Sequence, residues 1–250
     1  MAAPFIVTYL HHSGFMVAAG RRLLVFDYYS NPSEPALAKR LRRLVADAAA
    51  DADRITIFAS HQHHDHYDPE IWRLDLAGRP CDTVLSDDIS GQAVPAGQEP
   101  FRMKAGDSLQ LGDLRVSAFG STDAGVSFLV EQPGLRLFHA GDLNWWNWID
   151  ESTPDELVEY ERDFRAVIGD LQPAASALDC VFFPVDPRLG TVSHCGAEIF
   201  LQTFHPAHFF PMHFAWDYAE TDRFSAMMAP RFPDTVIHTI QQSGDCFRLE

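Results

Sequence analysis

One short segment, rich in histidine, constrains the fold and chemistry of this chain more than any other. The run Ser60-His61-Gln62-His63-His64-Asp65-His66 directly follows an apolar stretch, residues 55–59, that is typical of a buried strand. Loops held by a rigid strand are common places for functional sites. Imidazole and carboxylate groups are ligands that zinc, iron and manganese accept. The pattern His61-x-His63-x-Asp65-His66 therefore predicts a metal site at a strand end.

The rest of the first 60 residues predicts short strands and one helix. Apolar runs separated by turn-forming residues indicate strands at residues 5–10, 15–19 and 23–26, and a further strand at 54–59. Helical spacing of leucine and alanine predicts a helix over residues 35–49, which Ser33 can cap.

The remainder alternates between strands and helices. Thr153 and Glu156 form a predicted capping box, with Pro154 at the first helical position of a helix that runs toward Leu171. Further strands are expected at residues 108–111, 114–119, 126–131, 135–140, 181–184, 209–212, 236–240 and 246–249, and helices at 196–204 and 221–228. Strands open each half and helices cover them, which favours an α/β fold, a four-layer αβ/βα sandwich. We see no repeat or long linker, and we expect a single domain over residues 1–250.

Composition excludes several classes of protein. The formal net charge is −16, from 35 acidic and 19 basic residues, which argues against a broad nucleic-acid-binding face. The four cysteines lie far apart and form no Cys-x-x-Cys pair, as expected of reduced thiols in a cytoplasmic protein. No apolar stretch reaches the roughly 18 residues of a membrane span. We therefore expect a cytoplasmic protein that binds neither membrane nor nucleic acid.

Several motifs in chain order resemble the metallo-β-lactamase fold superfamily. His61-x-His63-x-Asp65-His66 is similar to its signature loop, and Phe26-Asp27 resembles its early strand-end aspartate, which is usually structural. His139-Ala140-Gly141-Asp142 resembles the family's Gly-Asp, and Phe210-Pro211-Met212-His213 its late strand-end histidine. The opening His12-Ser13-Gly14-Phe15 is similar to the branch of phosphorylated-sugar lactonases and phospholipases. Other runs resemble a little-characterised group of small bacterial members.

The resemblance implies a ligand set. His61 and His63 would hold metal one, Asp142 would bridge, and metal two would be held by Asp65, His66 and His213. The family's third metal-one histidine is missing near Ser121. Three alternatives stay open: Asp123 supplies a carboxylate, His194 reaches the site, or metal one is absent. His12 and Asp186 are additional candidate site residues, because His12 belongs to the opening motif and Asp186 follows an apolar strand.

The implied activity is hydrolysis by metal-activated water, with Asp65 orienting the attacking water or accepting its proton. The expected cofactor is Zn²⁺, as one or two ions, with Mn²⁺ or Fe as alternatives. The expected substrate is a small-molecule ester, lactone or phosphodiester, and Trp145, Trp146 and Trp148 could wall an apolar pocket or pack in the core. A di-iron oxidoreductase and a non-catalytic metal or ligand binder are the alternative functions. Members of the superfamily often dimerise, so the resemblance implies that this chain forms homo-oligomers.

Overall fold

The computed structural model describes residues 4–250, apart from the side chain of Gln92. The chain divides into two compact units. Unit 1 contains the chain up to Met103 together with Gln241–Glu250, and unit 2 is Lys104–Ile240. Each unit contains one seven-stranded sheet, and each is described here by itself.

The sheet of unit 1 is mixed. Its strands lie in the order β14 (Cys246–Leu249), β1 (Phe5–Tyr9), β2 (Phe15–Ala19), β3 (Arg22–Phe26), β4 (Arg54–Ala59), β5 (Cys81–Ser86) and β6 (Phe101–Met103). Strands β14, β1, β2 and β3 pair antiparallel, whereas β3 to β6 pair in parallel. The predicted strands of this unit are present, but β5 and β6 were not predicted from the sequence.

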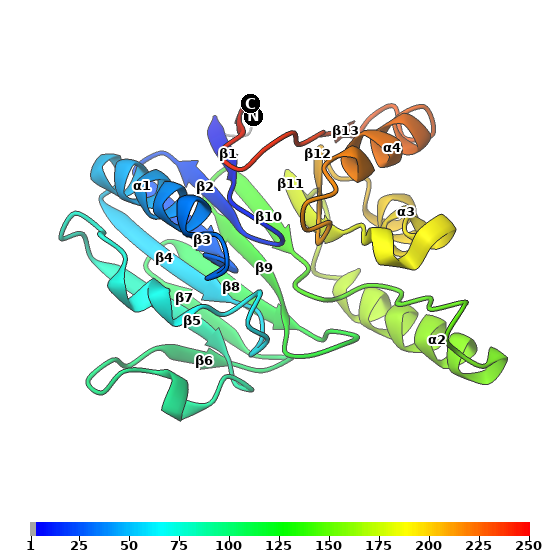
Figure 1. Ribbon diagram of the computed structural model, residues 1–250, viewed down its shortest axis with the longest axis horizontal. Coiled ribbons are helices and arrows are strands. Elements are labelled where there is room, and N and C mark those ends of the chain that lie inside the picture. Colours follow the sequence, from blue (N-terminus) through cyan, green and yellow to red (C-terminus); the bar gives the residue numbers. More distant parts are fainter. Residues whose placement is uncertain (1–3) are drawn as a thin grey trace. The chain divides into compact units, whose positions relative to one another are not determined.

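Helix α1 (Pro35–Asp51) covers one face of this sheet (Figure 1). Its buried residues Leu41, Val45 and Ala49 belong to the same apolar core as Val25 of β3 and Ile57 of β4. The prediction that Ser33 caps this helix is wrong. Pro35 occupies the first helical turn, so the cap falls on Glu34, which makes no side-chain capping hydrogen bond. Two short 3₁₀ helices, η1 (Pro69–Arg73) and η2 (Gly91–Ala93), follow β4 and β5.

The sheet of unit 2 begins as an antiparallel meander and ends in parallel strands. The order is β13 (Val236–Ile237), β12 (His208–Met212), β11 (Cys180–Pro184), β10 (Leu135–His139), β9 (Ser127–Gln132), β8 (Leu114–Phe119) and β7 (Ser108–Leu111). Strands β7 to β10 pair antiparallel, and β10 to β13 pair in parallel. Strand β13 is two residues long, shorter than the predicted strand at 236–240.

Three helices of unit 2 pack on this sheet through aromatic side chains. They are α2 (Pro154–Leu171), α3 (Cys195–Phe204) and α4 (Ala219–Met228), with the short η3 (Pro187–Val192) after β11. Ring centroids lie 6.3 Å apart for Phe164 and Phe183, 5.3 Å for Phe200 and Phe138, and 5.4 Å for Phe224 and Phe209. The capping box of α2 is confirmed, because Thr153 and Glu156 exchange both of its hydrogen bonds.

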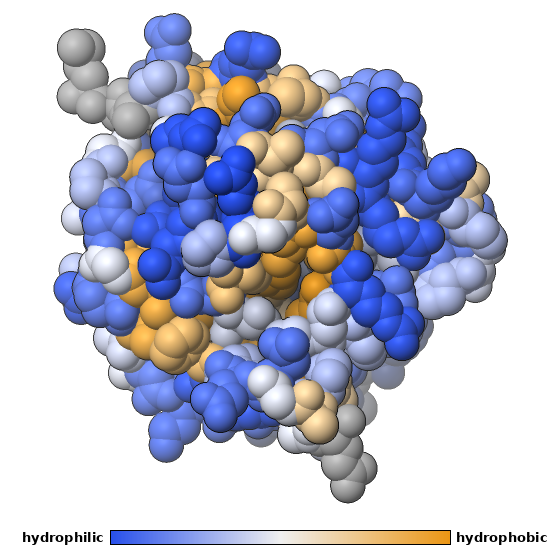
Figure 2. Space-filling view, turned by 90° about the vertical axis from the view of Figure 1, so that its left-hand side faces the viewer, coloured by the Kyte–Doolittle hydropathy of each residue, from blue (hydrophilic) through white to orange (hydrophobic). Residues whose placement is uncertain are grey.

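Hydrophilic side chains cover most of the face shown in Figure 2, and hydrophobic residues gather there in smaller patches. Among the described residues, no helix combines the length and the apolar character that crossing a bilayer requires.

Candidate metal centre

The predicted site residues of unit 1 follow the ends of strands that run in one direction. Asp27 follows β3 and the His61–His66 loop follows β4, and these two strands are parallel. His12 follows β1, which runs in the same direction because the antiparallel β2 lies between β1 and β3. The carboxyl ends of parallel strands meet at one edge of a sheet and are common places for ligands. One edge of the unit 1 sheet therefore carries all its candidate ligands.

The buried carboxylate of Asp27 holds the imidazole of His66. The Asp27 carboxylate accepts hydrogen bonds from the Ser60 amide at 2.8 Å, from the Ser60 hydroxyl at 2.7 Å and from His66 Nδ1 at 2.7 Å. Asp27 and His66 are both fully buried. Because Nδ1 of His66 carries the proton of this bond, its Nε2 carries the lone pair that a metal takes. The role of Ser60 was not predicted.

The same network orients His61 and His63. The single hydroxyl proton of Ser60 is donated to Asp27, so Ser60 Oγ accepts from His61 Nδ1 at 3.0 Å. His61 Nε2 lies 3.0 Å from His63 Nδ1. His61 is buried and His63 is exposed. The two predicted metal-one histidines therefore lie together, with the inner one fixed by a chain of hydrogen bonds that ends on Asp27.

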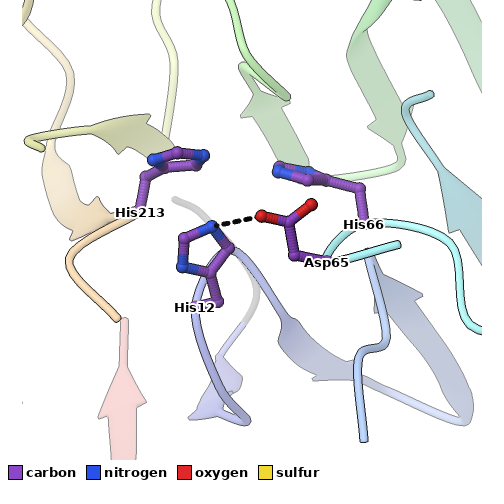
Figure 3. A group of neighbouring side chains, drawn as sticks. All are labelled: His12, Asp65, His66 and His213. Atoms are coloured by element: carbon purple, nitrogen blue, oxygen red, sulfur yellow. Dashed lines mark ion pairs between the residues drawn. The ribbon is translucent and has the colours of Figure 1, made fainter. Parts of the chain in front are cut away.

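His12 and Asp65 form an ion pair beside His66 (Figure 3). His12 Nε2 lies 3.3 Å from Asp65 Oδ2, and one ligand atom from each of His12, Asp65 and His66 lies within 4.8 Å of the others. Burial by itself raises the pKa of Asp65, but the hydrogen bond from His12 and the charges of His66 and His12 outweigh it and lower that pKa below its usual range. Asp65 is therefore an ionised carboxylate at neutral pH.

A glycine lets the His12 turn pack closely. A Cβ atom on Gly14 would lie 2.9 Å from the backbone oxygens of both Asp27 and His11. Only glycine fits this approach without a shift of backbone, which explains the glycine of the His12-Ser13-Gly14-Phe15 motif. His64, in contrast, has a side chain that is 84% exposed and faces solvent.

The candidate residues of unit 2 also gather at one edge of their sheet. Asp142 follows β10, Asp186 follows β11 and His213 follows β12, and these strands are parallel. Asp123 lies in the loop after β8, which runs in the same direction as β10. Ligand oxygens of Asp123 and Asp142 lie within 4.8 Å of each other. His139 accepts a hydrogen bond from the Gly141 amide and so holds the turn that presents Asp142.

His213 lies between two carboxylates. Its Nδ1 is 2.9 Å from Asp186 Oδ2, and its Nε2 is 3.3 Å from Asp142 Oδ1. Burial alone would raise the pKa of Asp186, but hydrogen bonds from His213 and Arg188 lower it to about 2. Asp186 is thus placed to orient His213, as Asp27 orients His66. Sequence reasoning named Asp186 but missed Arg188, which binds the same carboxylate.

The contact between His213 and Asp142 tests whether these residues fit a metal. With Nδ1 donating to Asp186, His213 Nε2 and the Asp142 oxygen lie 3.3 Å apart, a contact that a proton on Nε2 or a shared metal cation stabilises. Two ligands at 2.0–2.1 Å from a tetrahedral zinc ion are about 3.3 Å apart. The donor set of unit 2 therefore fits a divalent metal.

His194 lies elsewhere. It is the residue before α3 and lies 3.8 Å from Glu198, beside a separate cavity of about 180 Å³ that also includes Ser193 and Glu220. It belongs to neither group of close metal-ligating atoms found in the described part of the chain. Of the two residues considered for the missing ligand, the structure places only Asp123 near Asp142.

The loop that carries Asp142 packs against the start of α3 through a glycine. A Cβ on Gly196 would overlap Asn144 Oδ1 and lie 2.9 Å from the Trp145 backbone nitrogen.

We expect Gly196→Ala to lower the free energy of unfolding by about 1–3 kcal/mol, because the backbone must move. Chemical denaturation measures this change. Gly169→Ala on α2, where a Cβ meets nothing within 4 Å, is the matched control and should raise stability by roughly 0.5–1 kcal/mol. Equal effects at the two positions would contradict the packing argument.

The chain matches the sequence profile of the β-lactamase superfamily domain over residues 6–157. This match covers more than half of the chain, and the chain belongs to that family. The predicted resemblance to the metallo-β-lactamase superfamily is thereby confirmed. No curated protein sequence matches the chain.

Several solved structures resemble the chain along its length. A novel metallo hydrolase from Ignicoccus hospitalis, Igni18, has 14% sequence identity and a TM-score of 0.66, with 99% of each chain covered. The metallo-β-lactamase fold protein YhfI from Bacillus subtilis has 13% identity and a TM-score of 0.65, with 98% of this chain and 99% of YhfI covered. CmlA, a diiron β-hydroxylase from Streptomyces venezuelae, has 12% identity and a TM-score of 0.61, covering all of this chain but 55% of CmlA. At these identities the likeness shows the fold alone, and the predicted α/β fold of the metallo-β-lactamase type is confirmed.

Proposed function

We propose that this protein is a metal-dependent hydrolase that acts on a small-molecule ester, lactone or phosphodiester. The observation that carries the proposal is the pair of buried histidine–carboxylate contacts, His66 with Asp27 and His213 with Asp186. A carboxylate that holds Nδ1 fixes the tautomer in which Nε2 binds metal, and such partners are typical of metal-ligating histidines. Family membership and the named metallo hydrolase among the similar structures give further support.

The ligands would be those expected from the sequence. They are His61, His63, Asp65 and His66 in unit 1, and Asp142 and His213 in unit 2. We infer that Asp123, close to Asp142, takes the place of the missing histidine. When bound, a divalent cation such as Zn²⁺ supplies a Lewis acid that activates water and polarises the group attacked.

The protein's own residues would position water and substrate. Asp65, ionised and held by His12, would accept a hydrogen bond from the attacking water and orient it. Asp27 and Asp186 would keep His66 and His213 in the ligating tautomer. Arg188 would hold Asp186 in place through its guanidinium group.

Metal content measured beside hydrolysis tests this proposal. We expect protein purified without added metal to contain one or two equivalents, and to hydrolyse bis(p-nitrophenyl) phosphate or a member of a lactone panel. His61→Ala, His213→Ala and Asp123→Ala should each lose metal and activity. His205→Asn, at an exposed histidine with positive φ, is the matched control and should keep both. Near-zero metal in the wild type, with no change in the variants, would overturn the proposal. Iron together with oxygen consumption would favour the alternative, an oxidoreductase.

A further inference from the structure

Unit 2 contains a cavity of about 330 Å³ that begins at a proposed metal ligand. Its lining residues are Thr122, Asp123, Asp142, Trp146, Trp148, Tyr160 and Arg188. Asp142 and Trp146 are buried, whereas the side chain of Arg188 is 62% exposed, so the cavity leads from a buried acidic end to an open end. Its volume is near the lower limit of the roughly 300–1,000 Å³ found for small-molecule sites. It can take one small group rather than part of a polymer.

Aromatic rings form one wall of this cavity. The rings of Trp146 and Trp148 are stacked, with centroids 5.9 Å apart and an angle of 5° between their planes. Trp146 also donates a hydrogen bond from Nε1 to the backbone oxygen of Asp142 at 3.0 Å. The aromatic wall is therefore tied to the same loop as the proposed ligand. From the sequence, these tryptophans were expected either to wall an apolar pocket or to pack in the core, and the structure places Trp146 and Trp148 in the wall of a pocket.

Arg188 fixes the outer ring of this wall. Its guanidinium carbon lies 5.6 Å from the centroid of the Trp148 ring, a cation–π distance. The same guanidinium donates to Asp186 from Nε at 2.9 Å, so its position is set by a buried carboxylate. Because Trp146 and Arg188 both contact Trp148, the aromatic wall is pre-formed, and binding against it requires little ordering.

We propose that this cavity binds a flat aromatic or otherwise planar unsaturated group of the substrate, next to the reacting bond, and that Trp148 determines this preference. The inference rests on the proposed function, because it takes Asp142 as the reacting end of the cavity. The substrate class is then an aryl ester, or a comparably planar small-molecule ester, in preference to a non-planar one of equal size. Offset stacking favours a planar ring by about two- to tenfold beyond its apolar area.

Three phosphonates that differ only in their organic group test this inference. Phenylphosphonate, cyclohexylphosphonate and methylphosphonate are titrated calorimetrically into zinc-loaded protein, and the zinc content of each sample is measured. We expect phenylphosphonate to bind about two- to tenfold more tightly than cyclohexylphosphonate. Trp148→Leu should bring the ratio of these two dissociation constants to about one, and Trp148→Phe should retain it. Trp216→Leu, at an exposed tryptophan outside the lining, is the matched control and should leave it unchanged.

The ratio is taken within one protein sample, so a partly unfolded variant does not alter it. Equal binding of phenyl- and cyclohexylphosphonate by fully zinc-loaded wild type would overturn the inference and leave the proposed function standing. A ratio that survives Trp148→Leu, or that falls equally in Trp216→Leu, would also overturn it. A wild type that takes up no zinc would instead overturn the proposed function, and with it the inference that this cavity binds a planar group of the substrate.

Discussion

Asparagine in place of Asp65 is expected to lower kcat by about 10²- to 10⁴-fold, the usual contribution of a positioned acid–base group. The side chain keeps its shape, but it loses the charge that pairs with His12 and the capacity to accept a proton. The pKa of Asp65 lies below its usual range, so the wild-type group is ionised throughout the neutral range and the substitution removes a full charge. Steady-state kinetics on the best substrate of the panel measure the change.

Metal analysis of Asp65→Asn separates the two roles proposed for this residue. A fall in kcat with metal retained indicates orientation of water, and a joint loss indicates ligation. The control is Gln62→Ala in the same loop, whose side chain is exposed, and it should stay within about twofold of wild type. Unchanged kcat in Asp65→Asn would exclude Asp65 from the chemistry.

Substitution of Asp27 is expected to lower the stability of the fold or its affinity for metal, depending on the replacement. Asp27→Ala leaves the Ser60 amide and His66 without their acceptor, and we expect the free energy of unfolding to fall by about 3–5 kcal/mol, as when one partner of a buried pair is removed. Asp27→Asn keeps the shape but offers an NH₂ group toward Ser60 and His66. His66 then accepts at Nδ1 and carries its proton on Nε2, and metal affinity should fall about 10- to 100-fold.

Denaturant unfolding and competition with a chelator measure these two effects. Asp53 provides the control, because it also pairs with a cation, Arg21, but both side chains are about 60% exposed. An exposed pair contributes little, so Asp53→Ala should leave the denaturation midpoint and metal content unchanged. If Asp27→Asn bound metal as tightly as wild type, the orienting role of the carboxylate would be refuted.

The elements predicted best are those with strong local signals. Helix α2 begins at Pro154 and ends at Leu171, as predicted, because a capping box, a first-turn proline and an amphipathic pattern agree. Strand β5 was missed because Cys81, Asp82 and Thr83 begin it with polar or small residues, and its pairing with β4 depends on residues far away in the chain. Parallel pairing leaves no hairpin turn that a sequence pattern could reveal.

The site shows the same division between local and distant signals. The His61–His66 loop, Asp142 and His213 could be named because each follows a strand within a short motif. Asp186 was harder, since an aspartate before Pro187 is typical of a turn. In the structure, Asp186 has two roles. Its carboxylate accepts a hydrogen bond from the Arg188 amide, which caps the turn, and another from His213 Nδ1, which orients that histidine. The second contact joins residues 27 positions apart and has no local signature.

Three residues at the two sheet edges share an unusual backbone conformation. His12, Asp27 and His213 have φ values of 56°, 43° and 67°, in the left-handed region that favours glycine. Such a conformation costs a residue with a side chain about 1–2 kcal/mol. Glycine at these positions would relieve that cost and remove the functional group at the same time. At His12 a search for heat-resistant variants would therefore tend to select against the side chain that pairs with Asp65. At Asp27 and His213 the loss of a buried pair, with His66 and Asp186 respectively, would outweigh that relief, so there stability and activity favour the same residue.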